Sequence, residues 1–126
     1  MREIKFRAWD GKRMQFMGHG GCYDFIIEGG CVSVFSDYSH DRHQKVWPLM
    51  QYTGLKDSEG VKIYEGDVLR WPGTNSNFHV VYSEQNGAFF YEDLKHGGLM
   101  GMAGISKSGK IIGNVYQNPE LLEVSK

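Results

Sequence analysis

The chain has 126 residues, the size of one ordinary domain. Its 14 basic and 15 acidic residues nearly cancel, so no overall field draws it to nucleic acid or to an anionic membrane. The start, MREIKFRAWD, lacks the apolar core of a signal peptide, and no run of about 18 apolar residues follows. We therefore expect a cytoplasmic protein without a membrane span.

The composition favours β-structure. Seventeen glycines stand beside seven Phe, seven Tyr and three Trp residues. Aromatic side chains pack well on pleated surfaces, and glycine supplies the positive φ angles that tight turns need. A mainly β protein with many short strands is expected.

A first hairpin is predicted near the N-terminus. Apolar residues at 4, 6 and 8 alternate with Lys5, Arg7 and Trp9, which is the period of a half-buried strand, and Asp10-Gly11 then breaks the run. A three-residue loop over 10–12 sets Ala8 opposite Met14, apolar against apolar, so we expect that register.

A second hairpin and a boundary follow. The β-rich runs 23–27 and 31–35 are divided by Glu and two glycines. The segment 36–45 is polar and without apolar period, which predicts a loop. It either separates an N-terminal β subdomain, 1–45, from a second unit, 46–126, or lies within one continuous domain.

The middle of the chain alternates strands and turns. Asp57 is able to bond its own backbone, and Gly60 is free to take the left-handed conformation, so the two favour a turn. The expected order is a strand at 46–52, a turn at 57–60, a return strand at 61–64, a sharp turn at 65–67 and a strand at 68–71.

Asn86-Gly87 lies between the β-rich runs 78–83 and 88–91. Asn-Gly in this setting is the strongest short-range signal for a hairpin. The stretch 95–104 is so rich in glycine that a helix there is disfavoured, and we expect a flexible loop with an apolar foot.

Two further elements are expected at the C-terminal end. Ser108-Gly109 divides the runs 105–107 and 110–116, which predicts a last hairpin. Asn118 and Pro119 have the residue types of a helix N-cap and first helical position, so a short C-terminal helical turn should follow.

Four blocks of the sequence carry a family resemblance, in this order: MREIKFRAWD, LMQYTGLKDSEGVKIYEGDVLR, NGAFF and IIGNVYQNPELLE. With them the chain resembles the YopX family of small phage and prophage proteins. The resemblance implies N-terminal β-hairpins packed on a small SH3-like barrel that begins near Val46, and a source in a bacteriophage or prophage-bearing bacterium. Residues 17–44 fit the family pattern least. No established activity, and hence no catalytic residue, comes with the resemblance.

The sequence also lacks recognisable catalytic motifs. There is no nucleophile elbow, and the glycine-rich stretches lack the ending of a phosphate loop. Glu65 and Asp67 flank a turn glycine, which accounts for them structurally, as turn formation does for Asn114. We expect a non-enzymatic protein with no catalytic residue, no cofactor and no metal.

Two metal hypotheses are the alternatives. A zinc site of the Cys2His2 type could be formed by Cys22, Cys31, His40 and His43. The two cysteines are nine positions apart, unlike the tight knuckle of a zinc site, so buried thiols and loop histidines are favoured over zinc ligands, and buried thiols over a disulfide. Acidic residues and histidines also lie close together in one polar loop, which would suit a metal-assisted enzyme, but a solvated loop is the favoured interpretation because loops are usually exposed and polar. The loop residues are Asp37, His40, Asp41 and His43.

Aromatic residues offer the one candidate binding surface, comprising Trp71, Phe78, Phe90 and Tyr91. We expect a module that binds a host or phage protein, or a second copy of itself, through a barrel edge and the loops 71–78 and 95–104. The alternative is a barrel that binds single-stranded nucleic acid by stacking. The near-zero net charge argues against nucleic acid as the partner.

Overall fold

The protein is described from a computed structural model, which covers residues 3–16, 23–28, 31–36, 45–73, 76–102 and 108–122. The chain divides into two compact units. One is Ile4–Gln51, and the other comprises Met1–Glu3 and Tyr52–Lys126. The long strand β5 (Lys45–Lys56) runs through the division.

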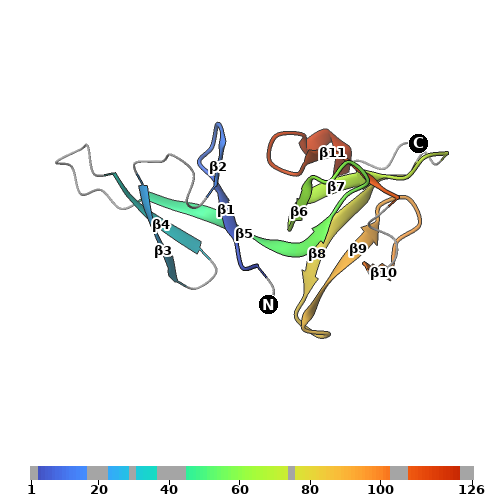
Figure 1. Ribbon diagram of the computed structural model, residues 1–126, viewed down its shortest axis with the longest axis horizontal. Coiled ribbons are helices and arrows are strands. Elements are labelled where there is room, and N and C mark those ends of the chain that lie inside the picture. The colour runs from blue at the N-terminus through green and yellow to red at the C-terminus, as the bar shows by residue number, and fades with distance from the viewer. Residues whose placement is uncertain are drawn as a thin grey trace. The chain divides into compact units, whose positions relative to one another are not determined.

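The unit Ile4–Gln51 is built from antiparallel β-hairpins (Figure 1). Its strand order is β2-β1-β5-β4-β3. The pairing of β1 with β2, and of β3 with β4, confirms both hairpins that the sequence predicts. The strand bounds are β1 Phe6–Trp9, β2 Met14–Phe16, β3 Tyr23–Glu28 and β4 Cys31–Ser36.

The register predicted for the first hairpin is wrong. Trp9, not Ala8, is opposite Met14, so the loop has four residues, 10–13, in place of three. The reason is a cap formed by Asp10: its Oδ1 accepts the backbone N–H groups of Lys12 at 2.7 Å and Arg13 at 2.6 Å. This local bonding fixes the wider turn and outweighs the apolar pairing.

The second unit is dominated by a five-stranded antiparallel sheet in the order β10-β9-β8-β7-β11 (Figure 1). The sheet curls into a half-barrel, and a single turn of 3-10 helix, η1 (Pro119–Leu122), follows β11. The predicted fold class, a mainly β protein with a small barrel-like C-terminal part and a short C-terminal helical turn, is confirmed. The remaining strand bounds are β6 Lys62–Tyr64, β7 Asp67–Arg70, β8 Phe78–Ser83, β9 Ala88–Asp93, β10 Leu99–Gly101 and β11 Lys110–Asn114.

The predicted turns of the middle segment are present. Gly60 has a φ of 81° and Gly66 a φ of 91°, values that residues with a Cβ rarely adopt. Gly66 lies between β6 and β7, donates its N–H to the Val80 carbonyl at 2.9 Å and accepts from Val115 N–H at 2.9 Å. It thereby ties the Glu65-Gly66 corner to other parts of the unit.

The prediction of a loop over 95–104 is wrong at residues 99–101. Instead of remaining a loop, residues 99–101 form β10, which pairs antiparallel with β9. Gly97 and Gly98 have φ angles of 76° and 87°, and Asp93 N–H bonds the Gly98 carbonyl at 3.1 Å. The glycines therefore supply the turn that returns the chain against β9.

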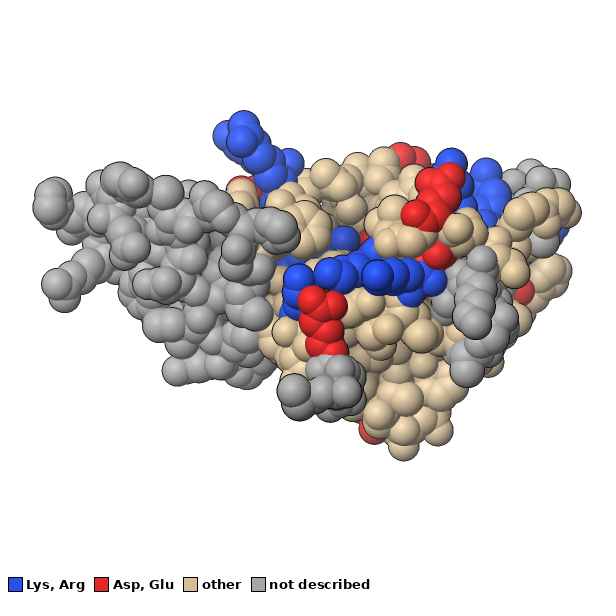
Figure 2. Space-filling view, viewed as in Figure 1, with Lys and Arg blue, Asp and Glu red and all other residues tan. Residues whose placement is uncertain are grey.

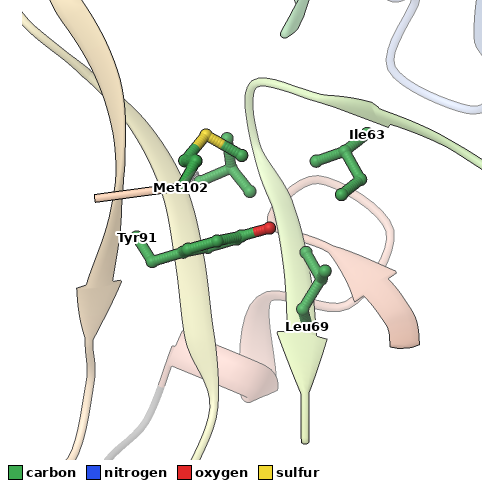
Figure 3. Packing of buried hydrophobic residues seen from close by; sticks show 5 residues of the cluster. Ile63, Leu69, Tyr91 and Met102 are labelled. Atoms are coloured by element: carbon green, nitrogen blue, oxygen red, sulfur yellow. The ribbon is translucent and has the colours of Figure 1, made fainter. Parts of the chain in front are cut away.

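The core of the second unit is a cluster of fully or almost fully buried side chains. Figure 3 shows the Tyr91 ring extending from β9 with its hydroxyl end toward β7 and Met102 beside the ring. Tyr91 is 0% exposed and Met102 6%. The cluster consists of Ile63, Leu69, Val80, Tyr91 and Met102.

Within the described residues, no helix has the length and apolar character needed to cross a membrane. The sequence-predicted domain boundary between residues 45 and 46 stays a prediction.

Candidate functional site

Three of the four residues of the predicted aromatic surface pack on one another. The Trp71 ring meets Phe78 edge to face, with centroids 4.6 Å apart, and meets Tyr91 in the same way at 5.0 Å. Trp71 and Phe78 are half-buried against the core cluster, whereas Tyr91 is fully buried. A fully buried ring has no face to offer a ligand, so Tyr91 serves packing. The surface hypothesis stays a prediction for the other residues of the set.

Phe90 lies on the opposite face of the sheet from Tyr91, because successive strand residues point to opposite faces. Phe90 is half-buried. Its cross-strand neighbours are Val81 on β8 and Gly101 on β10. Phe90 is therefore the member of the predicted set that lies on this second face, next to the edge of the sheet.

We expect Gly109→Ala to destabilise the unit. A Cβ at Gly109 would lie 2.9 Å from Cε2 and 3.0 Å from Cζ2 of Trp71, a ring that Phe78 and Tyr91 hold in place. Overpacking of this kind lowers the free energy of unfolding by about 1–3 kcal/mol. Urea denaturation would measure the loss. Gly101→Ala, where the new Cβ meets nothing within 4 Å, is the matched control, and equal losses would contradict the packing argument.

The buried acids of the central family block bond backbone groups. Asp57 is 6% exposed and Asp67 2%. Oδ2 of Asp67 accepts the Tyr64 N–H at 2.8 Å across the β6–β7 corner. Oδ1 of Asp57 accepts two N–H groups of its own turn, and Oδ2 accepts the Ile111 N–H at 3.1 Å. These carboxylates stabilise turns, so the block has a structural role.

Asn114 plays the same part at the end of β11. It is 6% exposed, and its Oδ1 accepts the N–H groups of Tyr116 at 3.1 Å and Gln117 at 2.9 Å. The following backbone N–H, of Asn118, bonds the Asn114 carbonyl at 2.8 Å. The side chain therefore organises the turn that leads into η1.

Sequence reasoning missed a titratable pair on the second face of the sheet. His79 on β8 is directly opposite Glu92 on β9. Burial lowers the pKa of His79 below its ordinary value, and the nearby Glu92 carboxylate opposes that shift without cancelling it. The register of the predicted Asn86-Gly87 hairpin is the signal that would have paired these residues.

A pH dependence follows from His79. Because its pKa is depressed in the folded state, folding favours the neutral ring. This contribution is present above the ordinary histidine pKa of about 6.5 and is lost as the pH falls toward the lower folded value. We expect the urea midpoint of the wild type to fall more than that of His79→Gln between about pH 7.5 and about pH 5.5, a window around that pKa. Parallel pH profiles would contradict the assignment.

Cys22 and the loop residues from Asp37 to His43 lie outside the described part of the chain, so both metal hypotheses stay predictions.

His96 is exposed and its Nδ1 is 3.1 Å from Asp93 Oδ2. Desolvation would raise the pKa of Asp93, but bonds from the backbone N–H groups of His96 and Lys95 hold it below its usual value. Both bonds stabilise the turn between β9 and β10.

The two edges of the half-barrel sheet differ. At the β11 edge the strand begins with an exposed Lys110 and has a register shift between Ile111 and Gly113. The turn at 57–60 also covers this edge, because Ser58 N–H donates to the Gly109 carbonyl at 2.8 Å. Charge, irregular pairing and cover are the devices by which proteins keep an edge strand from pairing with another chain.

The β10 edge has none of those three devices among the described residues. Its residues are uncharged, and its three pairs with β9 run without a register shift. Leu99 is 47% exposed and Met100 39%. Within the described part of the chain, the shortness of β10 is its one protection against pairing with another strand. This edge, with exposed apolar side chains and no strand beyond it in the described chain, is the candidate functional site.

The fold and this edge define a class: small proteins of two β-sheet units, one a half-barrel with an open apolar edge. A family model described as YopX protein matches residues 5–123 of this chain. The chain therefore belongs to the YopX family, as the sequence resemblance indicates.

Solved structures have the same fold. A crystal structure of a protein from Enterococcus faecalis is 24% identical, with a TM-score of 0.65, over 98% of this chain and 100% of that one. The X-ray structure of protein yopX from Bacillus subtilis is also 24% identical, with a TM-score of 0.61, over 100% of both chains. At this identity the likeness concerns the fold alone. No curated protein matches the chain.

Proposed function

We propose that this protein is a non-enzymatic module that binds another protein by strand addition to β10. The observation that carries the proposal is the contrast between the protected β11 edge and the unprotected β10 edge of one sheet. In strand addition, backbone hydrogen bonds supply affinity and alternate side chains supply specificity. Leu99 and Met100 point to opposite faces and would contact the added strand on each side.

The charges of the described surface agree with a protein partner. Figure 2 shows Lys and Arg side chains beside Asp and Glu side chains on the viewed face, with uncharged residues over much of the described surface. Binding to nucleic acid draws on several basic contacts. The alternative of a single-strand-binding barrel is further weakened because Tyr91, one of its stacking residues, is buried.

The proposal extends to the setting in which the module works. We propose a phage or prophage source and a cytoplasmic location in the bacterial host, which the family resemblance and the lack of a signal-peptide pattern at the start of the sequence support. The partner is then a host or phage protein in that compartment, or a second copy of this chain.

Capture from the host lysate tests the proposed function. Wild-type protein and two variants, Met100→Lys and Val61→Lys, are immobilised, and the bound proteins are identified. Val61 is 50% exposed, and its carbonyl accepts the Asp57 N–H of the turn that covers the opposite, β11 edge, so it is a matched control for adding a lysine to an apolar surface. We expect a partner that the wild type and Val61→Lys retain and Met100→Lys loses, with slower amide hydrogen exchange at residues 99–101 in the complex. A partner that all three retain would refute strand addition at β10.

A further inference from the structure

We infer that the occupant of the β10 edge is the β10 edge of a second copy of this chain, in an antiparallel two-fold pair centred on Met100. The inference rests on the proposed function and names its partner. Two-fold dimers are the commonest homo-oligomers, and their interface uses the same surface on both copies. The question is whether β10 is complementary to itself.

The side-chain sizes along β10 are self-complementary. In a pair centred on Met100, each Met100 is opposite its own copy, and each Leu99 is opposite Gly101 of the partner. A large side chain, Leu99, is therefore opposite a residue without one, Gly101, at both outer positions of the pair. The ladder has three pairs, since the next residue, Met102, is buried in the core of its own unit.

The partner's Leu99 would extend a row of cross-strand neighbours that ends at Gly101 and contains apolar side chains. Val81, Phe90 and Gly101 are consecutive cross-strand neighbours on β8, β9 and β10. In the paired edge the partner's Leu99 is the next member of that row. Gly101 has no side chain, and a Cβ there would meet nothing within 4 Å, so the space between Phe90 and the partner's Leu99 is open. Leu99 would cover the half-buried Phe90 across that gap.

Charge does not oppose the pairing. The net charge of the chain is −1, so two copies repel one another little. The residues of β10 carry no charge that would meet its own kind across a two-fold axis. A short ladder belongs to the class of small, weak interfaces, so we expect a reversible dimer.

Sedimentation velocity of the whole chain tests for this dimer over roughly 1 µM to 1 mM, the range of weak association. We expect the sedimentation coefficient of the wild type and of Val61→Lys to rise with concentration. Met100→Lys places two like charges opposite one another, and its association should weaken at least tenfold. A wild type that stays monomeric over this range, or a dimer that Met100→Lys leaves unchanged, overturns the inference.

A cross-linking experiment tests the register. Residues directly opposite in an antiparallel pair have Cα atoms about 4.5–5.5 Å apart, within the range that a disulfide spans. The Met100→Cys variant should therefore oxidise to a dimer whose disulfide joins the two introduced thiols, identified by mass spectrometry of the linked peptides. Two copies of Leu99→Cys would be about 8 Å apart in this register and should link far less. Equal linking of the two variants would overturn the two-fold centre at Met100.

The two proposals fail separately. The wild type could be a monomer in sedimentation and still capture another protein that Met100→Lys no longer retains. That result would overturn the inferred dimer but would support strand addition at β10. If the chain forms a dimer that Met100→Lys does not weaken, the dimer uses another surface and the inference is overturned. The capture experiment alone then tests the proposed function.

Discussion

Replacing Asp57 by alanine should cost roughly 3 kcal/mol of the free energy of unfolding, because it leaves three part-buried backbone N–H groups without this acceptor. The carboxylate accepts from Glu59 N–H and Val61 N–H, both at 2.9 Å, and from Ile111 N–H at 3.1 Å. Domains of this size have about 5–15 kcal/mol in total, so this loss is a large fraction. Thermal unfolding followed by circular dichroism should show a lower midpoint.

The asparagine variant separates the two oxygens of Asp57. Asp57→Asn can keep Oδ1 and both bonds within the turn, but its amide nitrogen would face the N–H of Ile111. An intermediate loss is expected. Glu59→Ala is the surface control, since the Glu59–Lys110 pair is about 60% exposed on both sides and should contribute less than about 1 kcal/mol. If Asp57→Ala resembled Glu59→Ala, Asp57 would not be the organising residue of this turn.

Replacing Tyr91 by alanine should cost about 3–5 kcal/mol, the range for removing a large aromatic side chain from a core. Tyr91 is fully buried, contacts Trp71 edge to face and lies beside Met102 (Figure 3). Its loss would leave a cavity at the centre of the half-barrel sheet. Urea denaturation would report the change in the free energy of unfolding.

Phe90→Ala is the neighbouring control and has a different expected effect. Phe90 is half-buried on the other face, so its removal should cost about 1 kcal/mol of stability by lost apolar burial. Phe90→Ala should also weaken the proposed dimer, because Phe90 would contact the partner's Leu99. Equal stability losses for Tyr91→Ala and Phe90→Ala would contradict the assignment of one residue to the core and the other to the interface.

Local chemistry made much of this fold predictable from the sequence. The Asn86-Gly87 turn, the Asp57–Gly60 turn and the Pro119 helical turn are each determined by a few neighbouring residues. The family resemblance then supplied the architecture of the C-terminal part. Such signals need no knowledge of distant contacts, and all three elements are present.

Three features could not be predicted from the sequence: the register of the first hairpin, the core face of β9 and the strand β10. Each depends on contacts between distant or competing groups. The Asp10 cap widened the first hairpin, because one carboxylate with two short backbone bonds outweighed an apolar pairing. The alternation of residues along β9 predicts that Tyr91 and Phe90 lie on opposite faces of the sheet, but it does not indicate which face packs on the core. The edge strand β10 forms despite its glycine content, since pairing with β9 compensates for poor local propensity. The candidate site lies in that strand.

The Asp57–Ile111 bond joins residues 54 positions apart, and β11 is the partner that closes the other side of β7. Contacts of such separation form slowly, because the chain must lose loop-closure entropy first. Until β11 has paired with β7, the half-barrel sheet is open at β7 as well as at β10, and a chain at that stage of folding is more prone to aggregate than the folded protein.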